Sequence, residues 1–210
     1  LFRSSAASDV YKRQVIHLAA ESGVDLSIKN PRKSFDININ GTFNYLDACR
    51  INNVRNFIFA SSGSVFGDAK PPMNEMTLKN PISTYGSSKL SIETFCETYS
   101  KIFEINTTIL RFSNAYGPYS SHKKSIVANF SKNIINKKTI SINGDGKTTR
   151  DYIHVSDIVK AIDNSLNQKD SFQNFNISTG KQTSINILLK NITNIFSKFG
   201  YIIEKKNALE

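Results

Sequence analysis

Short apolar runs alternate along this chain with longer stretches whose apolar residues recur at helical spacing. The runs VIHLAA (Val15–Ala20) and NFIFAS (Asn56–Ser61) are typical of buried parallel strands, and Asn30–Ile51 between them is typical of a helix. The further predicted elements are a helix at Tyr85–Phe103, a strand at Thr107–Ser113, a helix at Ser125–Asn136, a strand at Thr139–Ile142, a helix at Val155–Asn167, a strand at Phe175–Ser178, a helix at Ser184–Phe199 and a strand at Tyr201–Glu204. Repeated strand–helix–strand units predict an α/β fold with a parallel sheet covered on both faces.

The first fourteen residues, LFRSSAASDVYKRQ, differ in composition from the remainder of the chain. They contain neither Asn nor Ile, which residues 15–210 use heavily, and they lack the regions of a signal peptide. We expect residues 1–14 to be an extraneous or disordered leader, with an ordinary flexible N-terminus as the alternative.

Composition narrows the class of protein. With 210 residues, 39% of them hydrophobic, the chain is long enough to bury a core, and it fits no collagen-like, disulfide-scaffold or disordered class. No apolar run approaches the roughly 20 residues that cross a bilayer. Neither Cys49 nor Cys96 lies in a metal or redox spacing. We expect a soluble, cytoplasmic protein with no membrane partner and no metal.

The formal net charge is +10, which is compatible with nucleic acid, an anionic small molecule or a Lys-rich surface. The lysines are dispersed along the chain, and no basic stretch is interleaved with aromatic residues. We therefore expect no nucleic-acid partner.

The most informative spacing is Tyr85-Gly-Ser-Ser-Lys89 at the start of a predicted helix. Residues four apart share one helix face, so an ammonium lies beside a phenol there. A phenol has a pKa of about 10, and a neighbouring cation moves that pKa towards neutrality, which makes a usable proton acceptor. Tyr119 and Tyr201 also precede a Lys by four residues, but only Tyr85 opens a long helix after a buried strand.

A second group of polar residues comes directly after the strand Asn56–Ser61, in the sequence SSGSVFG. Ligands of parallel sheets bind beyond the carboxyl ends of the strands, where these hydroxyls emerge. A serine there can hydrogen-bond a substrate hydroxyl that Tyr85 deprotonates, although a Ser/Gly-rich turn without chemistry has the same composition.

These motifs, together with LRFSNAYGP and GDGKTTRDYIHVSDI further along, resemble the extended short-chain dehydrogenase/reductases in order and spacing. Within them the chain is most similar to the NAD-dependent nucleotide-sugar epimerase/dehydratase family, UDP-glucose 4-epimerases above all. HLAAES and FDININGT also match, so the resemblance extends from Val15 to about Phe196.

The resemblance implies a role for each matching residue. Tyr85 would be the catalytic base, Lys89 its pKa-lowering partner and a contact of the nicotinamide ribose, and Ser62 the hydroxyl that binds the sugar. Asn114 would contact the substrate and Arg150 its nucleotide diphosphate. The cofactor NAD would be contacted by Leu18, Ala19, Ala20, Asn38, Ser61, Tyr85, Lys89 and Ser113.

The resemblance also bears on the reaction. The family's 4,6-dehydratases carry an Asp-Glu pair directly after the Ser/Thr, and here those positions hold Gly63 and Ser64. We therefore expect a 4-epimerase that acts through a transient 4-keto sugar on a nucleotide sugar, UDP-linked as in the family members it resembles most. A dehydratase, decarboxylase or reductase of the family, and a non-catalytic sugar-nucleotide binding protein, are the alternatives.

The family begins with a strand and a glycine-rich turn that binds pyrophosphate, and no such turn precedes Val15. We expect a Rossmann-type doubly wound sheet that lacks its first strands, in residues 15–113, and a smaller α/β substrate-binding domain in 114–210, with 151–178 returning to the first domain. Such a fragment would bind NAD poorly and not turn over. The full-length protein would be a homodimer.

Overall fold

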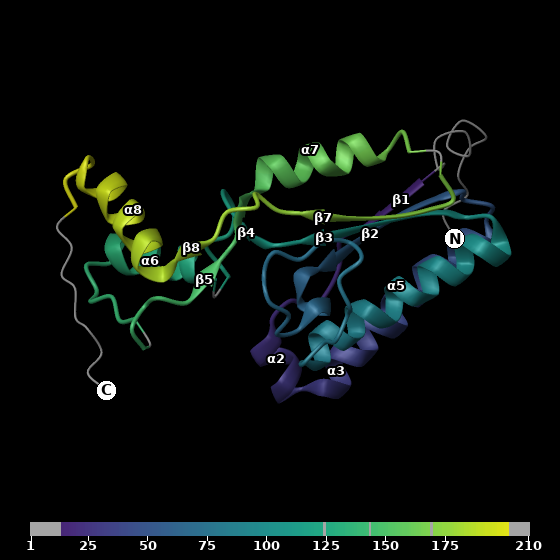
Figure 1. Ribbon diagram of the computed structural model, residues 1–210, viewed down its shortest axis with the longest axis horizontal. Helices are drawn as coiled ribbons and strands as arrows, with labels where there is room; N and C mark the ends of the chain where they lie inside the picture. The colour runs from purple at the N-terminus through teal and green to yellow at the C-terminus, as the bar shows by residue number, and fades with distance from the viewer. Residues whose placement is uncertain (1–13, 124, 143, 169, 202–210) are drawn as a thin grey trace, which may run out of the picture. The chain divides into compact units, whose positions relative to one another are not determined.

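The computed structural model describes residues 14–123, 125–142, 144–168 and 170–201. These residues form two compact units (Figure 1). The first comprises the described residues up to Phe112 together with Lys160–Ile177, and the second comprises Ser113–Val159 and the described residues from Ser178 onward.

The first unit is built on a four-stranded parallel sheet in the order β1-β2-β3-β7. The strands are β1 (Gln14–His17), β2 (Asn56–Ser62), β3 (Asn106–Phe112) and β7 (Phe172–Ile177). Five consecutive residues of β2 and five of β3 are buried, as the continuous apolar runs predict for strands covered on both faces. Since all four strands are parallel, their carboxyl ends share one edge of the sheet.

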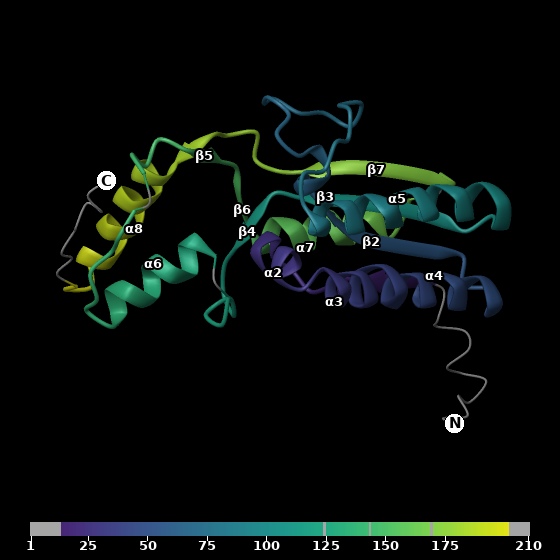
Figure 2. The ribbon, with the colours of Figure 1, turned by 90° about the horizontal axis from the view of Figure 1, so that it is seen from below.

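Helices cover the two faces of this sheet. One face is covered by α2 (Val24–Lys29), α3 (Pro31–Phe35), α4 (Thr42–Ile51) and α5 (Thr84–Phe103) (Figures 1 and 2). The part of α7 (Val155–Ser165) that belongs to this unit lies against the opposite face. The parallel sheet with helices on both faces confirms the α/β prediction.

The segment predicted as one helix at Asn30–Ile51 is interrupted in the middle. Between α3 and α4 the backbone adopts a π-helix, η1 (Asp36–Gly41). A π-helical turn rotates the residues after it relative to the preceding ones, and such turns are frequent at functional sites. Asn38 lies in this turn with 1% of its surface exposed.

Helix α5 is fixed at both ends. The Ser83 side chain accepts a hydrogen bond of 3.0 Å from the backbone N–H of Gly86, which caps the N-terminus. At the other end Glu104 takes a left-handed conformation with φ of 55°. Cys96 and Ile92 on its inner face pack in the core of this unit. The other core residues are Leu46, Cys49, Phe57, Phe59, Tyr99, Ile105 and Ile109.

The second unit contains two short sheets and two amphipathic helices. β4 (Asn114–Tyr116) pairs in parallel with β6 (Tyr152–His154), and β5 (Thr149–Arg150) pairs antiparallel with β8 (Thr183–Ser184). The helices are α6 (Ile126–Ile135) and α8 (Ile185–Ser197). Phe130 and Ile134 of α6 and Leu188, Leu189 and Ile192 of α8 form a core together with Ile140, which comes after α6.

The differences from the sequence prediction concern short elements. The predicted strand Thr139–Ile142 is reduced to a single bridge residue, Ile140, and β1 begins one residue early, at Gln14. The predicted leader, apart from Gln14, and most of the predicted strand Tyr201–Glu204 lie outside the described residues. A short 3-10 helix, η2 (Gly63–Phe66), comes after β2. Among the described residues, no helix has the length and apolar character needed to span a bilayer.

Candidate active site

Three of the predicted side chains meet where β2 ends and α5 begins. Ser62 is the last residue of β2, Tyr85 lies in the first turn of α5, and Lys89 lies one turn later. The Ser62 and Tyr85 side chains share a hydrogen bond. The Lys89 Nζ lies 5.8 Å from the centroid of the Tyr85 ring. The structure therefore brings together the proposed base, its cationic neighbour and the serine.

The Lys89 side chain is buried, with 3% of its surface exposed. Its Nζ donates a hydrogen bond of 2.7 Å to the carbonyl of Ala60 and lies 4.8 Å from the centroid of the Phe59 ring. Burial lowers the pKa of Lys89 to about 8, and the negative charge of Glu93 acts in the opposite direction. Lys89 is therefore charged at neutral pH but close to the point at which it loses its proton.

The electrostatics of Tyr85 differ from the sequence prediction. Burial raises the pKa of the Tyr85 phenol above its ordinary value, and the smaller, opposing effect is the hydrogen bond from Ser62. The sequence spacing predicts instead that Lys89 brings this pKa towards neutrality. In this structure desolvation is the larger effect, and the ammonium donates its hydrogen bond to the Ala60 carbonyl.

A buried ion pair lies directly behind these residues. The Arg111 guanidinium on β3 contacts the Glu93 carboxylate on α5 through Nη2 at 2.8 Å and Nε at 3.0 Å. Ser61 donates a hydrogen bond of 2.5 Å to the same carboxylate. All three residues are at most 4% exposed. The Ser61 hydroxyl is thus used inside the protein, and its predicted contact with a cofactor stays a prediction.

The residues Leu18–Ala20, predicted to contact the cofactor and called the cofactor loop below, come after β1 at the carboxyl edge of the sheet. Leu18 is 55% exposed, Ala19 is exposed and Ala20 is half-buried. The loop is held from behind by Asn38, whose Oδ1 accepts a hydrogen bond of 2.8 Å from the Glu21 N–H and whose Nδ2 donates one of 3.1 Å to the Glu21 carbonyl. Asn38 also donates to the hydroxyls of Ser34 and Ser88. The structure therefore places its amide behind the loop rather than on the surface.

The start of α5 is held in place by two contacts that the sequence did not reveal. The backbone N–H of Tyr85 donates a hydrogen bond of 3.0 Å to the Ser27 hydroxyl on α2. Gly86 packs so tightly that an added Cβ would lie 2.5 Å from the Ser64 carbonyl oxygen. Only glycine lets the helix approach the turn after Ser62 this closely.

The remaining predicted residues belong to the second unit. Ser113 donates a hydrogen bond of 3.2 Å to the Asp151 carboxylate, and the Asn114 side chain donates one of 3.0 Å to the Asp151 carbonyl. The same carboxylate accepts the backbone N–H groups of Thr179 and Lys181. Asp151, which the sequence motifs do not single out, therefore joins three segments of this unit, residues 113–114, 150–151 and 179–181.

Arg150 immediately precedes Asp151 and is exposed. Its Nη1 donates a hydrogen bond of 2.9 Å to the carbonyl of the neighbouring Thr149. The other guanidinium N–H groups have room to bind an oxyanion, for which the planar fork of arginine is suited.

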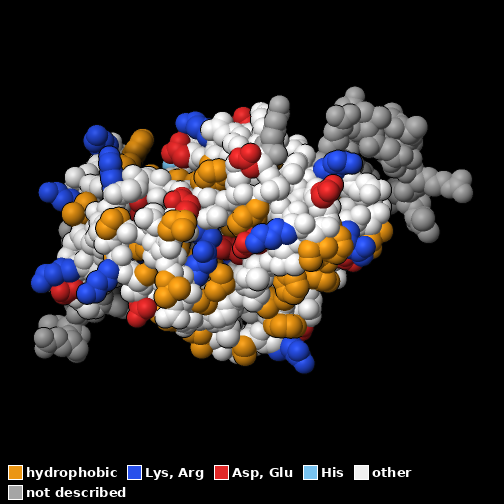
Figure 3. All heavy atoms as spheres, turned by 45° about the vertical axis from the view of Figure 1, so that its right-hand side comes forward, with side chains coloured by type: hydrophobic (Ala, Val, Ile, Leu, Met, Phe, Trp, Pro, Cys, Tyr) orange, Lys and Arg blue, Asp and Glu red, His pale blue; other side chains and the backbone are white. Residues whose placement is uncertain are grey.

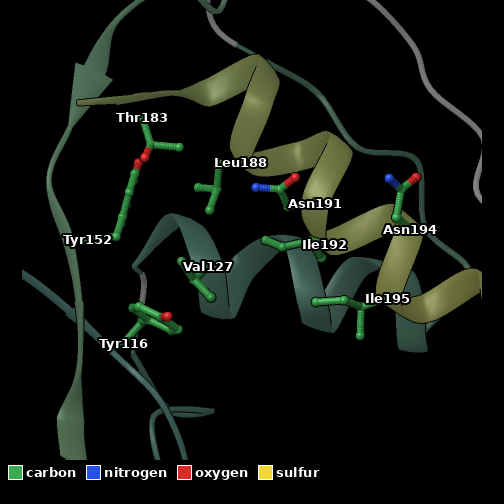
Figure 4. Close-up of a pocket in the computed structure, with 9 residues that line it drawn as sticks. All are labelled: Tyr116, Val127, Tyr152, Thr183, Leu188, Asn191, Ile192, Asn194 and Ile195. Atoms are coloured by element: carbon green, nitrogen blue, oxygen red, sulfur yellow. The ribbon is translucent and has the colours of Figure 1, made fainter. Parts of the chain in front are cut away.

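A cavity of about 550 Å³ lies within the second unit, between α6 and α8 (Figure 4). Val127 on α6 and Leu188 and Ile192 on α8 point into it, and Tyr116 and Tyr152 close one end. The other lining residues are Thr183, Asn191, Asn194 and Ile195. The lining contains neither Arg150 nor any other charged residue, so this cavity is distinct from the predicted diphosphate contact.

The fold and this arrangement define an α/β protein with a Tyr/Lys/Ser site at the carboxyl edge of a parallel sheet. Residues 4–178 match the NAD dependent epimerase/dehydratase family. The chain belongs to this family. The match begins at residue 4, within the segment that composition alone assigned to a leader.

Individual relatives agree with this assignment. The chain is 38% identical over 178 residues to a putative UDP-glucose 4-epimerase of Methanocaldococcus jannaschii, a match that covers 83% of this chain and 58% of that protein. The UDP-glucose 4-epimerase of Thermotoga maritima, solved with UDP-glucose, superposes with a TM-score of 0.86 at 31% identity, covering 94% of this chain and 65% of that one. The Thermus thermophilus UDP-glucose 4-epimerase, solved with NAD, gives 0.84 at 26% identity, with coverage of 96% and 66%.

The fold is accordingly of the Rossmann type. The chain spans about half the length of the curated relatives that it matches.

The residues at the carboxyl edge of the sheet fit NAD, the cofactor of this family. The exposed loop at Leu18–Ala20 lies where dinucleotides bind parallel sheets. The Lys89 ammonium has three N–H donors, and among the described residues Ala60 accepts one of them, so two are left for the hydroxyls of a nicotinamide ribose.

Proposed function

We propose that this chain carries the catalytic residues of an NAD-dependent nucleotide-sugar 4-epimerase, with a UDP-hexose as substrate. The observation that carries the proposal is the meeting of Ser62, Tyr85 and Lys89 at the end of β2. A phenol hydrogen-bonded to a hydroxyl and accompanied by a buried ammonium has no use in a protein that only binds sugar nucleotides. This favours an enzyme over a non-catalytic relative.

In the proposed reaction Tyr85 accepts the proton of the sugar's C4 hydroxyl, while Ser62 hydrogen-bonds the same oxygen and holds it in place. NAD, when bound, supplies the hydride acceptor at C4 and the positive charge of the oxidised nicotinamide. That charge and the Lys89 ammonium favour the phenolate, which offsets the desolvation that raises the pKa of Tyr85. Tyr85 then returns the proton to the C4 oxygen of the inverted sugar.

Epimerisation is favoured over elimination of water by the residues directly after Ser62. A dehydration at C5 and C6 needs an additional acid and base. Gly63 and Ser64 form the first turn of η2, and the backbone N–H of Ser64 donates a hydrogen bond of 3.2 Å to the Ser62 hydroxyl oxygen. No carboxylate stands at these two positions. A 4-epimerase, in contrast, uses the same phenol for both half-reactions.

The second unit is proposed to bind the nucleotide part of the substrate. Arg150 would bind the diphosphate, and Asn114, held by the Asp151 carbonyl, would contact the sugar. Ser113 would contact the nicotinamide through its backbone, because its side chain is bonded to Asp151.

We also propose that the whole protein is a homodimer. The outer surfaces of α4 and α5 expose Tyr45, Phe95, Ile102 and Phe103, with exposed fractions between 40% and 64%. Hydrophobic side chains also gather on the face that Figure 3 presents. A second copy covering the α4 and α5 face would remove these side chains from water. Light scattering of the purified protein tests the dimer, and a monomer at micromolar concentration would contradict it.

A chimera tests the activity. Residues 14–201 of this chain replace the matching segment of the Thermotoga maritima UDP-glucose 4-epimerase, and conversion of UDP-glucose to UDP-galactose is measured. We expect turnover that Tyr85→Phe lowers by roughly 10²–10⁴-fold, because the proton acceptor is lost. Tyr119→Phe is the matched control, since Tyr119 also precedes a Lys by four residues but is 95% exposed. Equal activity in the Tyr85→Phe and unsubstituted chimeras would contradict the proposal.

A further inference from the structure

Three consecutive residues at the end of β2 are held by three residues on one face of α5. Tyr85 is hydrogen-bonded to Ser62, Lys89 donates to the carbonyl of Ala60, and the residue between them, Ser61, donates to Glu93. Positions 85, 89 and 93 are spaced by four residues, so each lies one helical turn from the next. The contact between Glu93 and Ser61 is therefore the last of three that fix the end of β2 against α5.

Glu93 also joins a third element. Arg111 on β3 contacts both of its carboxylate oxygens, with Nη2–Oε2 at 2.8 Å and Nε–Oε1 at 3.0 Å, in the planar fork geometry that arginine forms with carboxylates. Phe66 covers the guanidinium, whose Cζ lies 5.4 Å from the ring centroid. Since Glu93 is 4% exposed and Arg111 3%, the carboxylate has one fixed position from which to hold Ser61.

The same carboxylate lies one turn from the buried Lys89 ammonium. Three titratable groups lie around Lys89: Tyr85 and Glu93 on α5 and His17 on β1. Arg111 on β3 binds the Glu93 carboxylate. Glu93 is the negative charge among them. Its attraction opposes the desolvation that lowers the pKa of Lys89.

We infer that Glu93 is a positioning residue of the proposed active site: held by Arg111, it fixes Ser61 so that Ser62 stays against Tyr85, and it places a negative charge one helical turn from the Lys89 ammonium. This inference rests on the proposed function, because it assigns Glu93 a task only through Ser62, Tyr85 and Lys89. Glu93 touches neither the proposed substrate position nor the cofactor loop among the contacts of the described residues.

The test is a pH titration of Lys89 Nζ by NMR in the 210-residue chain, with lysine isotopically labelled and the Lys89 signal assigned by its loss in Lys89→Met. We expect Glu93→Gln to lower the pKa of Lys89 by about one unit, as for the loss of an opposite charge within a helical turn. Glu97→Gln is the matched control: it removes the same charge one turn further along α5, from a side chain that is 45% exposed and paired with Lys101. We expect no shift there.

A pKa of Lys89 that is the same in folded Glu93→Gln and in the unsubstituted chain would overturn the inference. Circular dichroism shows whether the variant folds. If Glu93→Gln does not fold, Ser61→Ala tests the inference instead. This variant keeps the ion pair of Arg111 and Glu93 and removes only the hydrogen bond from Ser61 on β2 to Glu93. We then expect the pKa of Tyr85, measured with labelled tyrosine, to rise as its hydrogen bond from Ser62 loosens. An unchanged Tyr85 titration in Ser61→Ala would overturn the inference.

Neither titration requires NAD or a sugar nucleotide. Failure of the chimera to epimerise would contradict the proposed function and leave these pKa values as they are. Failure of the titrations would contradict the role of Glu93 and leave the proposed function standing.

Discussion

The Lys89 ammonium donates a hydrogen bond of 2.7 Å to the Ala60 carbonyl, two residues before Ser62 on the same strand. This contact holds the ammonium against the end of β2. Burial raises the pKa of Tyr85 although a cation lies 5.8 Å from the centroid of its ring. An oxidised nicotinamide bound at the carboxyl edge of the sheet would add a positive charge, which lowers the pKa of the Tyr85 phenol.

The first prediction concerns the close approach of α5 to the turn after Ser62. In Gly86→Ala the new Cβ would lie 2.5 Å from the Ser64 carbonyl oxygen and 3.0 Å from the Pro81 Cβ. We expect a loss of about 1–3 kcal/mol in the free energy of unfolding, as for overpacked sites, and a displaced Tyr85. Urea denaturation monitored by circular dichroism measures the loss.

Gly41→Ala is the matched control for that experiment, because its nearest neighbour beyond the local chain would be the Asp36 carbonyl at an ordinary 3.7 Å. We expect it to be neutral or slightly stabilising. Equal stabilities of the two variants would show that the approach at Gly86 is not tight.

The second prediction concerns the buried pair of Arg111 and Glu93. Arg111→Met leaves a buried carboxylate without its partner, which typically costs about 3–5 kcal/mol. We expect the double variant Arg111→Met/Glu93→Met to lose clearly less than the sum of the two single variants, since it leaves no unpaired charge. Additive losses in a double-mutant cycle would mean that the two side chains do not stabilise each other.

The third prediction concerns acid stability. The pKa of His17 is lowered from 6.5, mainly by burial and then by the charge of Lys89, and its Nε2 lies 3.0 Å from the Thr42 hydroxyl oxygen. Below pH 6.5 the unfolded chain binds a proton that the folded chain resists, so the free energy of unfolding falls as the pH falls through this range. The difference in this free energy between the unsubstituted chain and His17→Gln should therefore shrink between about pH 7.5 and 5.5. A difference that is constant over this range speaks against a buried, neutral His17.

The fourth prediction concerns the hydrogen bond between Ser62 and Tyr85, which lowers the pKa of the phenol. Ser62→Ala removes that effect and leaves desolvation in place. We expect the pKa of Tyr85 to rise further, as measured by NMR titration of labelled tyrosine. A Tyr85 titration that stays where it is would show that Ser62 does not donate to the phenolate.

The sequence predicted the long buried strands, helix α5 and the Ser62, Tyr85 and Lys89 group, because each produces a strong local pattern. It missed the π-helix η1, since a single extra residue in a turn leaves the apolar spacing of Asn30–Ile51 nearly unchanged. Helix α2, with six residues, is too short to show a period. These features depend on tertiary packing, which hydrophobic spacing does not record.

The positioning contacts were missed for a different reason. Arg111 lies inside the apolar run TTILRFS and Glu93 on the inner face of α5, and a charge in a buried position is a signal that a partner is present. The sequence does not say which partner it is. Asp151 gave no signal, because its bonds to Thr179 and Lys181 join segments nearly thirty residues apart.

In the proposed reaction, hydride leaves C4 of the sugar and returns to it while Tyr85 moves the proton. The most direct test is conversion by the chimera of UDP-glucose that carries deuterium at C4, with mass spectrometry and NMR of the product. We expect UDP-galactose that retains deuterium at C4, with the conversion lost in Tyr85→Phe. Deuterium released to solvent, or conversion that persists at the same rate without the Tyr85 hydroxyl, would contradict it.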